Sequence, residues 1–136
     1  MVGVALGAKP LAALAGAAFA FGLTACGHLR APVPVQADTF MQAVVHRDAE
    51  HGWQQLCPAA RDQLPLALVR DQAAAQRAAE ADRGLSLSLD YVGARPTPDG
   101  GEIRLYLVVA HFPEGKDERR TYTIHTQASG CVDSVE

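Results

Sequence analysis

Three cysteines, at positions 26, 57 and 131, carry the most reactive side chains in this sequence. A cysteine thiolate can act as a nucleophile, bind a metal ion or enter a disulfide. Cys26 directly follows the small residues Thr24 and Ala25, and its thiol is the only strong nucleophile at the end of an uncharged segment. This arrangement favours a covalent modification of Cys26, because small residues fit the pocket of a processing peptidase.

The segment before Cys26 is typical of an export signal. Residues 11–23 contain no charge and follow a single base, Lys9. An apolar run of this length matches the central region of a signal peptide and is shorter than the about 20 residues of a membrane span. Together with Leu23-Thr24-Ala25-Cys26 it resembles the lipobox of bacterial lipoprotein precursors, in which a diacylglyceryl group is attached to the cysteine before cleavage.

This resemblance implies that residues 1–25 are removed and that Cys26 carries a lipid anchor. We therefore expect the protein to be extracytoplasmic and anchored to the cell membrane. The alternative is an uncleaved N-terminal helix with an incidental cysteine. Residues 27–37, with two prolines and no helical or strand period, are expected to form an extended tether between the lipid and a domain over residues 38–136.

The charge of the mature chain excludes one class of partner. Residues 26–136 contain 11 basic and 15 acidic residues, a net charge near −4, and no basic cluster beyond Arg119-Arg120. We therefore expect no nucleic-acid partner. In an exported domain the two remaining cysteines, Cys57 and Cys131, are expected to form a disulfide. A metal pair and a reactive thiol are the alternatives, although neither cysteine has further ligands at a metal-site spacing.

The first half of the domain has helical periodicity. Asp38 is a suitable N-cap for a helix to about His51, which Gly52 interrupts, and a short second helix from Trp53 is stopped by Pro58. A third helix is predicted over residues 66–82, closing at Gly84. The helix end at 80–83 and the charged turn at 117–120 are expected to be solvated, and Trp53 is expected in the core or at a pocket rim.

The second half alternates apolar and polar residues. This pattern predicts strands over residues 85–91, 103–109 and around 122–124, with turns at 96–101 and 113–117. Residues 131–135 form either a fourth strand or a continuation of the third past a bulge at Gly130. We therefore predict an α+β fold, with three N-terminal helices packed on one face of a curved antiparallel sheet of three to four strands.

The two faces of the sheet follow from the assumed pairing. If Phe112 and Arg119 flank the second turn, Leu105 faces Thr126 and Leu107 faces Ile124. The face toward the helices then carries Leu85, Leu87, Leu89, Ile103, Leu105, Leu107 and Ile124. The outward face carries Tyr106, Val108, Ala110 and Phe112 beside Arg104, Thr121, Thr123 and His125.

The element order resembles that of exported nuclear-transport-factor-2-like domains. The residues that carry the resemblance are the helix Phe40-Met-Gln-Ala-Val-Val-His-Arg-Asp48, the segment Trp53-Gln-Gln-Leu-Cys57 and the ending Gly130-Cys131-Val132. Such domains are cystatin-like α+β cones, common in small actinobacterial lipoproteins. The resemblance covers residues 38–136 and implies a Cys57–Cys131 disulfide and a pocket between the helices and the sheet.

Enzymatic members of that group place an Asp, His or Tyr in the pocket as acid or base. The inward positions here offer no titratable group, and Tyr91 and Tyr122 are the nearest polar side chains. We therefore expect no enzymatic activity and no cofactor.

The histidines do not predict a metal site. His46 and His51 are five residues apart, so on one helix they diverge by about 140°. His111 and His125 are placed on opposite faces of the sheet, and His28 lies in the tether.

The outward face is a candidate interface. Tyr106, Val108, Phe112 and His125 form an apolar patch with a polar rim, and related cones often dimerise through this surface. If His125 lies in a dimer contact, its protonation below about pH 6.5 would weaken that contact. The alternative is that these are scattered exposed apolar side chains.

Two functions are consistent with these observations. The first is a non-catalytic lipoprotein that contacts a second copy of itself or another envelope protein. The second is a carrier or sensor that binds a small apolar ligand, such as a lipid or a polyketide, in the sheet–helix pocket.

Overall fold

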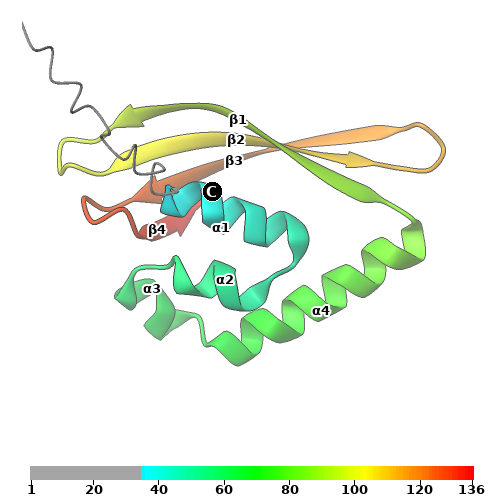
Figure 1. The fold of residues 1–136 in the computed structure, drawn as a ribbon, viewed down its shortest axis with the longest axis horizontal. Coiled ribbons are helices and arrows are strands. Elements are labelled where there is room, and N and C mark those ends of the chain that lie inside the picture. The colour runs from blue at the N-terminus through cyan, green and yellow to red at the C-terminus, as the bar shows by residue number, and fades with distance from the viewer. Residues whose placement is uncertain (1–34) are drawn as a thin grey trace, which may run out of the picture. The chain divides into compact units, whose positions relative to one another are not determined.

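The computed structural model describes residues 35–136. The predicted signal peptide, the lipidation site Cys26 and most of the tether lie outside this range. Four helices come first, α1 (Gln36–His46), α2 (Ala49–Gln54), α3 (Pro58–Gln63) and α4 (Leu66–Arg83). Four strands follow and form one antiparallel sheet in chain order (Figure 1): β1 (Ser86–Pro96), β2 (Glu102–His111), β3 (Asp117–Thr126) and β4 (Val132–Val135). The predicted α+β class is confirmed.

The helix predicted over residues 38–51 is in fact two helices. Arg47 adopts a left-handed conformation (φ 57°) and ends α1. The Asp48 carboxylate then accepts a hydrogen bond from the backbone N–H of His51 (3.2 Å), which caps α2. Gly52, which we expected to interrupt a helix, is buried inside α2. The periodicity did not reveal the break because neither glycine nor proline stands at it.

Two further helix boundaries differ from the prediction. Pro58 does not stop a helix but begins α3, because the first turn of a helix requires no N–H from its first residue. The second difference is at the start of α1. This helix begins at Gln36, inside the predicted tether, and Ala37 is fully buried. The prediction for α4 is confirmed, including its end at Gly84, which adopts φ 62°.

The pairing of β2 with β3 differs from the prediction by three residues. Leu105 lies opposite Thr123, not Thr126. The cause is a tighter turn, in which the Phe112 N–H donates to the Lys116 carbonyl (2.9 Å) and the strands already meet at His111 and Asp117. Side chains alternate between the two faces of a sheet. When the pairing register shifts by an odd number of residues, the side chains of one strand therefore move to the opposite face relative to those of its partner strand.

The face of β2 that we expected to point outward therefore points toward the helices. Tyr106 and Val108 are 1% and 8% exposed, and they pack with Met41 of α1 in the core. On β1, Leu87 and Leu89 do face the helices as predicted. The outer face of β2 instead carries Ile103, Leu105 and Leu107, which we expected in the core.

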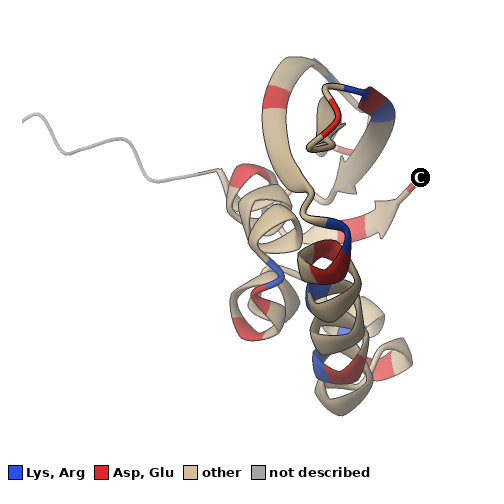
Figure 2. Ribbon diagram, turned by 90° about the vertical axis from the view of Figure 1, so that its right-hand side faces the viewer, with Lys and Arg blue, Asp and Glu red and all other residues tan. Residues whose placement is uncertain are grey.

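The helices form two layers on one side of the sheet (Figures 1 and 2). Helix α1 packs against the sheet, whereas α4 lies farther out, packed on α2. No residue of α4 is buried, and seven of its 18 residues are alanines, whose small side chains bury little area. The helices thus lie on one side of the sheet as predicted, and α4 joins them mainly through α2.

The last strand is separate from the third and is held to the helices. The chain turns at Gly130 (φ 88°), and β4 pairs antiparallel with β3. Cys57 and Cys131 form the predicted disulfide. Beside it, the Cys57 N–H donates to the Val132 carbonyl and the Val132 N–H donates to the Gln55 carbonyl, both at 2.8 Å. The junction of α2 and α3 is thus attached to the sheet edge by one covalent and two hydrogen bonds.

Candidate functional site

A cavity of about 240 Å³ lies between the inner face of the sheet and the C-terminal end of α4. A pocket between helices and sheet is also what the family resemblance implies. The apolar residues that line it belong to the β1 end next to α4, to the second half of β2 and to β3: Leu85, Leu87, Val108, Ala110, Phe112 and Tyr122. They share the cavity because Leu87 pairs with Ala110, and Val108 stands next to them on the same face of β2.

Arginines dominate the charged rim of this cavity. Arg47 is neutralised there, because its Nε donates to the Glu80 carboxylate (2.8 Å). The guanidinium of Arg83 stands over the Phe112 ring, 5.1 Å from its centroid. Arg120 pairs with Val108 and so lies on the inner face.

Two of these cations have no acidic partner in the part of the chain that the structure describes. No carboxylate of residues 35–136 lies within ion-pair distance of Arg83 or Arg120. Figure 2 shows the basic positions at the α4–β1 junction and on the β2–β3 hairpin. Glu118 also borders the cavity, so the rim carries an excess of positive charge. The cavity combines an apolar floor with guanidinium groups that can bind an anion.

The predicted interface residues do not form one surface. Tyr106 and Val108 are buried in the core, and Phe112 lies half-buried on the same inner face, beside Arg83. His125 lies on the outer face as expected, but opposite Ile103 rather than Tyr106. The shifted register is the cause of this separation. The outer face is nevertheless apolar along β2, and Val92, at a bulge in β1, is 58% exposed.

A buried polar network connects α1 with β2, and the sequence patterns did not reveal it. The Tyr106 hydroxyl donates to the Asp38 carboxylate and accepts from Arg104 Nε (3.0 Å). The Arg104 guanidinium also donates to Asp38 (3.1 Å) and to Glu102 (2.9 Å). Arg104 itself is only 8% exposed. The available signal was a charged residue at position 104 between the apolar neighbours Ile103 and Leu105.

This environment shifts two pKa values. Burial raises the pKa of Tyr106 above its ordinary range, and the hydrogen bond to Asp38 raises it further. Desolvation lowers the pKa of Arg104, but the hydrogen bonds to Tyr106 and Glu102 outweigh this, so the pKa of Arg104 is raised overall. Both groups are therefore held in their protonated forms, and the network is fully hydrogen-bonded.

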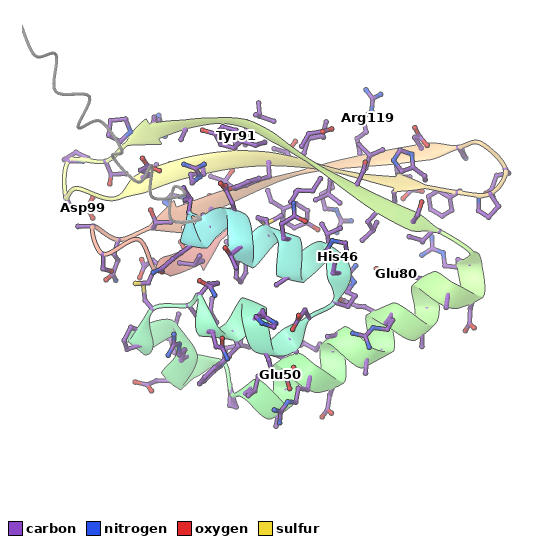
Figure 3. All side chains as sticks on the ribbon, viewed as in Figure 1. His46, Glu50, Glu80, Tyr91, Asp99 and Arg119 are labelled. Atoms are coloured by element: carbon purple, nitrogen blue, oxygen red, sulfur yellow. A yellow bond between two sulfur atoms is a disulfide. The ribbon has the colours of Figure 1, made fainter. Side chains whose placement is uncertain are left out.

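The histidines of the described residues are not gathered around a metal site. His46, labelled in Figure 3, lies exposed at the end of α1, and His51 Nδ1 lies 2.6 Å from an Asp48 oxygen. Within residues 35–136 no group of three potential metal ligands comes together. His111, in contrast, contacts two polar side chains that the sequence patterns did not connect with it, Ser88 and Asp117.

A second, smaller cavity of about 190 Å³ lies between α1, α2 and α4. Trp53 borders it, as expected for a pocket-rim residue, and its indole N–H donates to the Leu64 carbonyl (2.8 Å). The Arg61 guanidinium lies over the Trp53 ring, 5.0 Å from its centroid. The lining is mainly apolar, and Arg47 and Asp48 are its charged residues.

Comparisons with known proteins found no family model that matches the sequence and no similar curated protein. Among the helices of residues 35–136, none is long and apolar enough to cross a membrane.

Proposed function

We propose that residues 35–136 form an extracytoplasmic domain that binds a small anionic amphiphile, and that a lipid on Cys26 holds this domain at the membrane. One observation carries the proposal for the ligand. The cavity beside α4 joins an apolar floor to Arg83 and Arg120, which lack an acidic partner among the described residues.

The physical chemistry of the cavity defines the ligand class. An apolar chain on the floor gains about 0.8 kcal/mol for each methylene that leaves water. A guanidinium can bind a carboxylate or a phosphate through two parallel hydrogen bonds. The volume of about 240 Å³ lies just below the about 300–1,000 Å³ usual for ligand pockets, which favours a short chain.

A calorimetric titration with octanoate tests the proposal. We expect octanoate to bind more tightly than octanol, which lacks the charge, and octylammonium not to bind. Arg83→Gln and Arg120→Gln should each weaken octanoate binding by about fivefold, corresponding to about 1 kcal/mol for a partly exposed ion pair. Arg95→Gln is the matched control, because Arg95 pairs with Ile103 on the outer face. Equal binding of octanoate and octylammonium would contradict the proposal, as would equal losses in the Arg83 and Arg95 variants.

The membrane location has a separate test. In bacteria that express the full chain, Cys26→Ser should move the protein from the membrane fraction to the soluble fraction and remove the acyl mass. Membrane retention of this variant without any acyl mass would instead favour the uncleaved N-terminal helix.

The outer face of the sheet favours a second candidate function, contact with a second copy of this chain. Ile103, Leu105 and Leu107 project from β2 on the side away from α1, beside the exposed Val92. Sedimentation should then show a dimer that Leu105→Glu dissociates, whereas Leu68→Glu, at an exposed position of α4, should leave it intact.

A further inference from the structure

Ser88, His111 and Asp117 form a hydrogen-bonded chain across three strands. The Ser88 Oγ lies 2.9 Å from His111 Nε2, and His111 Nδ1 lies 3.0 Å from an Asp117 carboxylate oxygen. When Nδ1 carries its proton toward the carboxylate, Nε2 is free to accept the proton of the serine hydroxyl. The order of contacts, serine to Nε2 and Nδ1 to aspartate, is that of an activated serine nucleophile.

The sheet pairing sets this geometry. His111 lies directly opposite Asp117 on β3, and Ser88 on β1 lies diagonally to it, since Ser86 is the direct partner of His111. Three regular strands therefore position the three side chains, without a mobile loop. They lie on the outer face, opposite to the cavity beside α4.

The three groups are accessible to a substrate. The side chains of His111 and Asp117 are 43% and 45% exposed, and Ser88 is half-buried. No helix of the described chain packs on this face of the sheet, because α1 covers the other one. An electrophile can approach the Ser88 oxygen from solvent.

We propose that Ser88 is a nucleophile that cleaves small carboxylic esters, with His111 as its general base and Asp117 as the residue that positions His111. The Ser88 Oγ attacks the carbonyl carbon, and His111 Nε2 takes the serine proton and then passes it to the departing alkoxide. An acyl group on Ser88 and a free alcohol result. Water then attacks the acyl carbonyl, His111 takes a proton from that water and returns it to the departing Ser88 oxygen, and a carboxylic acid and free Ser88 are released.

Arg119, which also borders the cavity beside α4, supplies positive charge on the same face as Ser88. Val109 pairs with Ser88 on one side and with Arg119 on the other, so the three residues form one row across the strands. The ends of this row are about 10 Å apart at the backbone, two strand spacings, which a long arginine side chain can cover. Figure 3 shows Arg119 pointing away from the helices, on the side where ester and oxyanion would lie. Its guanidinium is the donor that this site offers to the developing oxyanion.

Covalent labelling with diisopropyl fluorophosphate tests the nucleophile. The Ser88 oxygen forms a bond to phosphorus, fluoride leaves, and the proton passes through His111 to solvent. Peptide mass spectrometry of the wild-type protein should place the label on Ser88. Ser88→Ala should abolish labelling, and His111→Gln should slow it by about 100-fold, the usual contribution of a general base. Ser86→Ala is the matched control, because Ser86 lies two residues away on the same strand face, and its labelling rate should equal that of the wild type.

Hydrolysis of 4-nitrophenyl acetate tests the roles of the other residues. Asp117→Asn should lower kcat and leave KM unchanged, and Asp117→Glu should restore part of kcat, which a merely structural role would not produce. Arg119→Gln should lower kcat in the same way. Label found equally on other serines, or a rate in Ser88→Ala equal to that of the wild type, would overturn the proposal. Circular dichroism of each variant separates loss of the fold from loss of the nucleophile, and this test is independent of amphiphile binding.

Discussion

At the scale of single residues, Arg104 is the buried charged side chain of residues 35–136. Its guanidinium is withdrawn from water beneath α1, yet Tyr106, Asp38 and Glu102 all accept from it. A buried charge with a complete set of partners is tolerated, but loss of one partner leaves the others unsatisfied. The network therefore makes the position of α1 on the sheet sensitive to individual hydroxyl and carboxylate groups.

Removal of the Tyr106 hydroxyl measures this sensitivity. Tyr106→Phe should lower the free energy of unfolding by about 1–3 kcal/mol, because it leaves Asp38 without its phenol donor and Arg104 Nε without its acceptor. Urea denaturation monitored by circular dichroism gives the value. Tyr91→Phe is the control, since Tyr91 is 53% exposed, and it should change the stability little. Equal effects of the two changes would mean that the network contributes nothing specific.

The raised pKa of Tyr106 also predicts how stability depends on alkaline pH. In the unfolded chain a tyrosine loses its proton near pH 10, whereas the folded state retains that of Tyr106 to higher pH. The folded state then binds more protons than the unfolded state, so stability is present below about pH 10 and is lost as pH rises toward the folded-state pKa. Urea midpoints should therefore fall steeply above about pH 10 in the wild type and less steeply in Tyr106→Phe. Parallel curves would contradict this assignment.

At the scale of secondary-structure elements, α4 is the longest of the four described helices, and like α3 it lies outside the core. It has no buried residue, and polar contacts attach it to the rest of the helical layer. Arg47 bonds to Glu80, Arg77 donates to the Arg47 carbonyl (2.7 Å), and Arg70 pairs with Glu50. The last pair is exposed and contributes little, so the partly buried Arg47–Glu80 pair is the strongest polar attachment of α4.

Breaking that pair should loosen α4 selectively. Glu80→Gln should speed hydrogen exchange of α4 amides about tenfold, because the partly buried pair contributes about 1–2 kcal/mol. Amides of the central strand β2 should keep their exchange rates. The control is Asp82→Asn, because Asp82 is an exposed carboxylate two residues farther along the same helix. Uniformly faster exchange in helix and sheet would show instead that α4 opens only together with the whole domain.

At the scale of the whole molecule, the disulfide limits the freedom of most of the domain. Cys57 and Cys131 are separated by 74 residues, which include α4 and the first three strands. In the chain-entropy model, closing a loop of this length stabilises the fold by roughly 4 kcal/mol. This is a large fraction of the total stability of a domain of this size.

The paired substitution Cys57→Ser with Cys131→Ser should therefore lower the free energy of unfolding by roughly 4 kcal/mol. The measurement is urea denaturation of the purified domain, with reduced wild-type protein for comparison. The paired variant and the reduced wild type should agree, because both lack the same covalent constraint. A loss well below this value in both proteins would indicate that their unfolded states are already compact.

Several features followed from local sequence alone. Alternating residues identified the first three strands, Gly84 ended α4, and the two cysteines outside the predicted signal segment predicted the Cys57–Cys131 bridge. Short-range chemistry decides each of these, because helix and strand periods and a left-handed glycine depend on neighbours within a few residues. The break at Arg47 escaped prediction, since its signal was a capping carboxylate at Asp48 inside a continuous helical pattern.

The pairing of distant residues was decided only by the tertiary structure. One turn, closed between Phe112 and Lys116, shifted β2 against β3 and exchanged the faces of the central strand. As a result Tyr106 lies in the core and not on the surface. Arg83 and Arg120 border the same cavity, which has an apolar floor. The same pairing placed His111 between Ser88 and Asp117. The sequence determined which segments become strands. The register of their pairing depends on turn geometry and on cross-strand packing, and an alternating pattern contains no information about either.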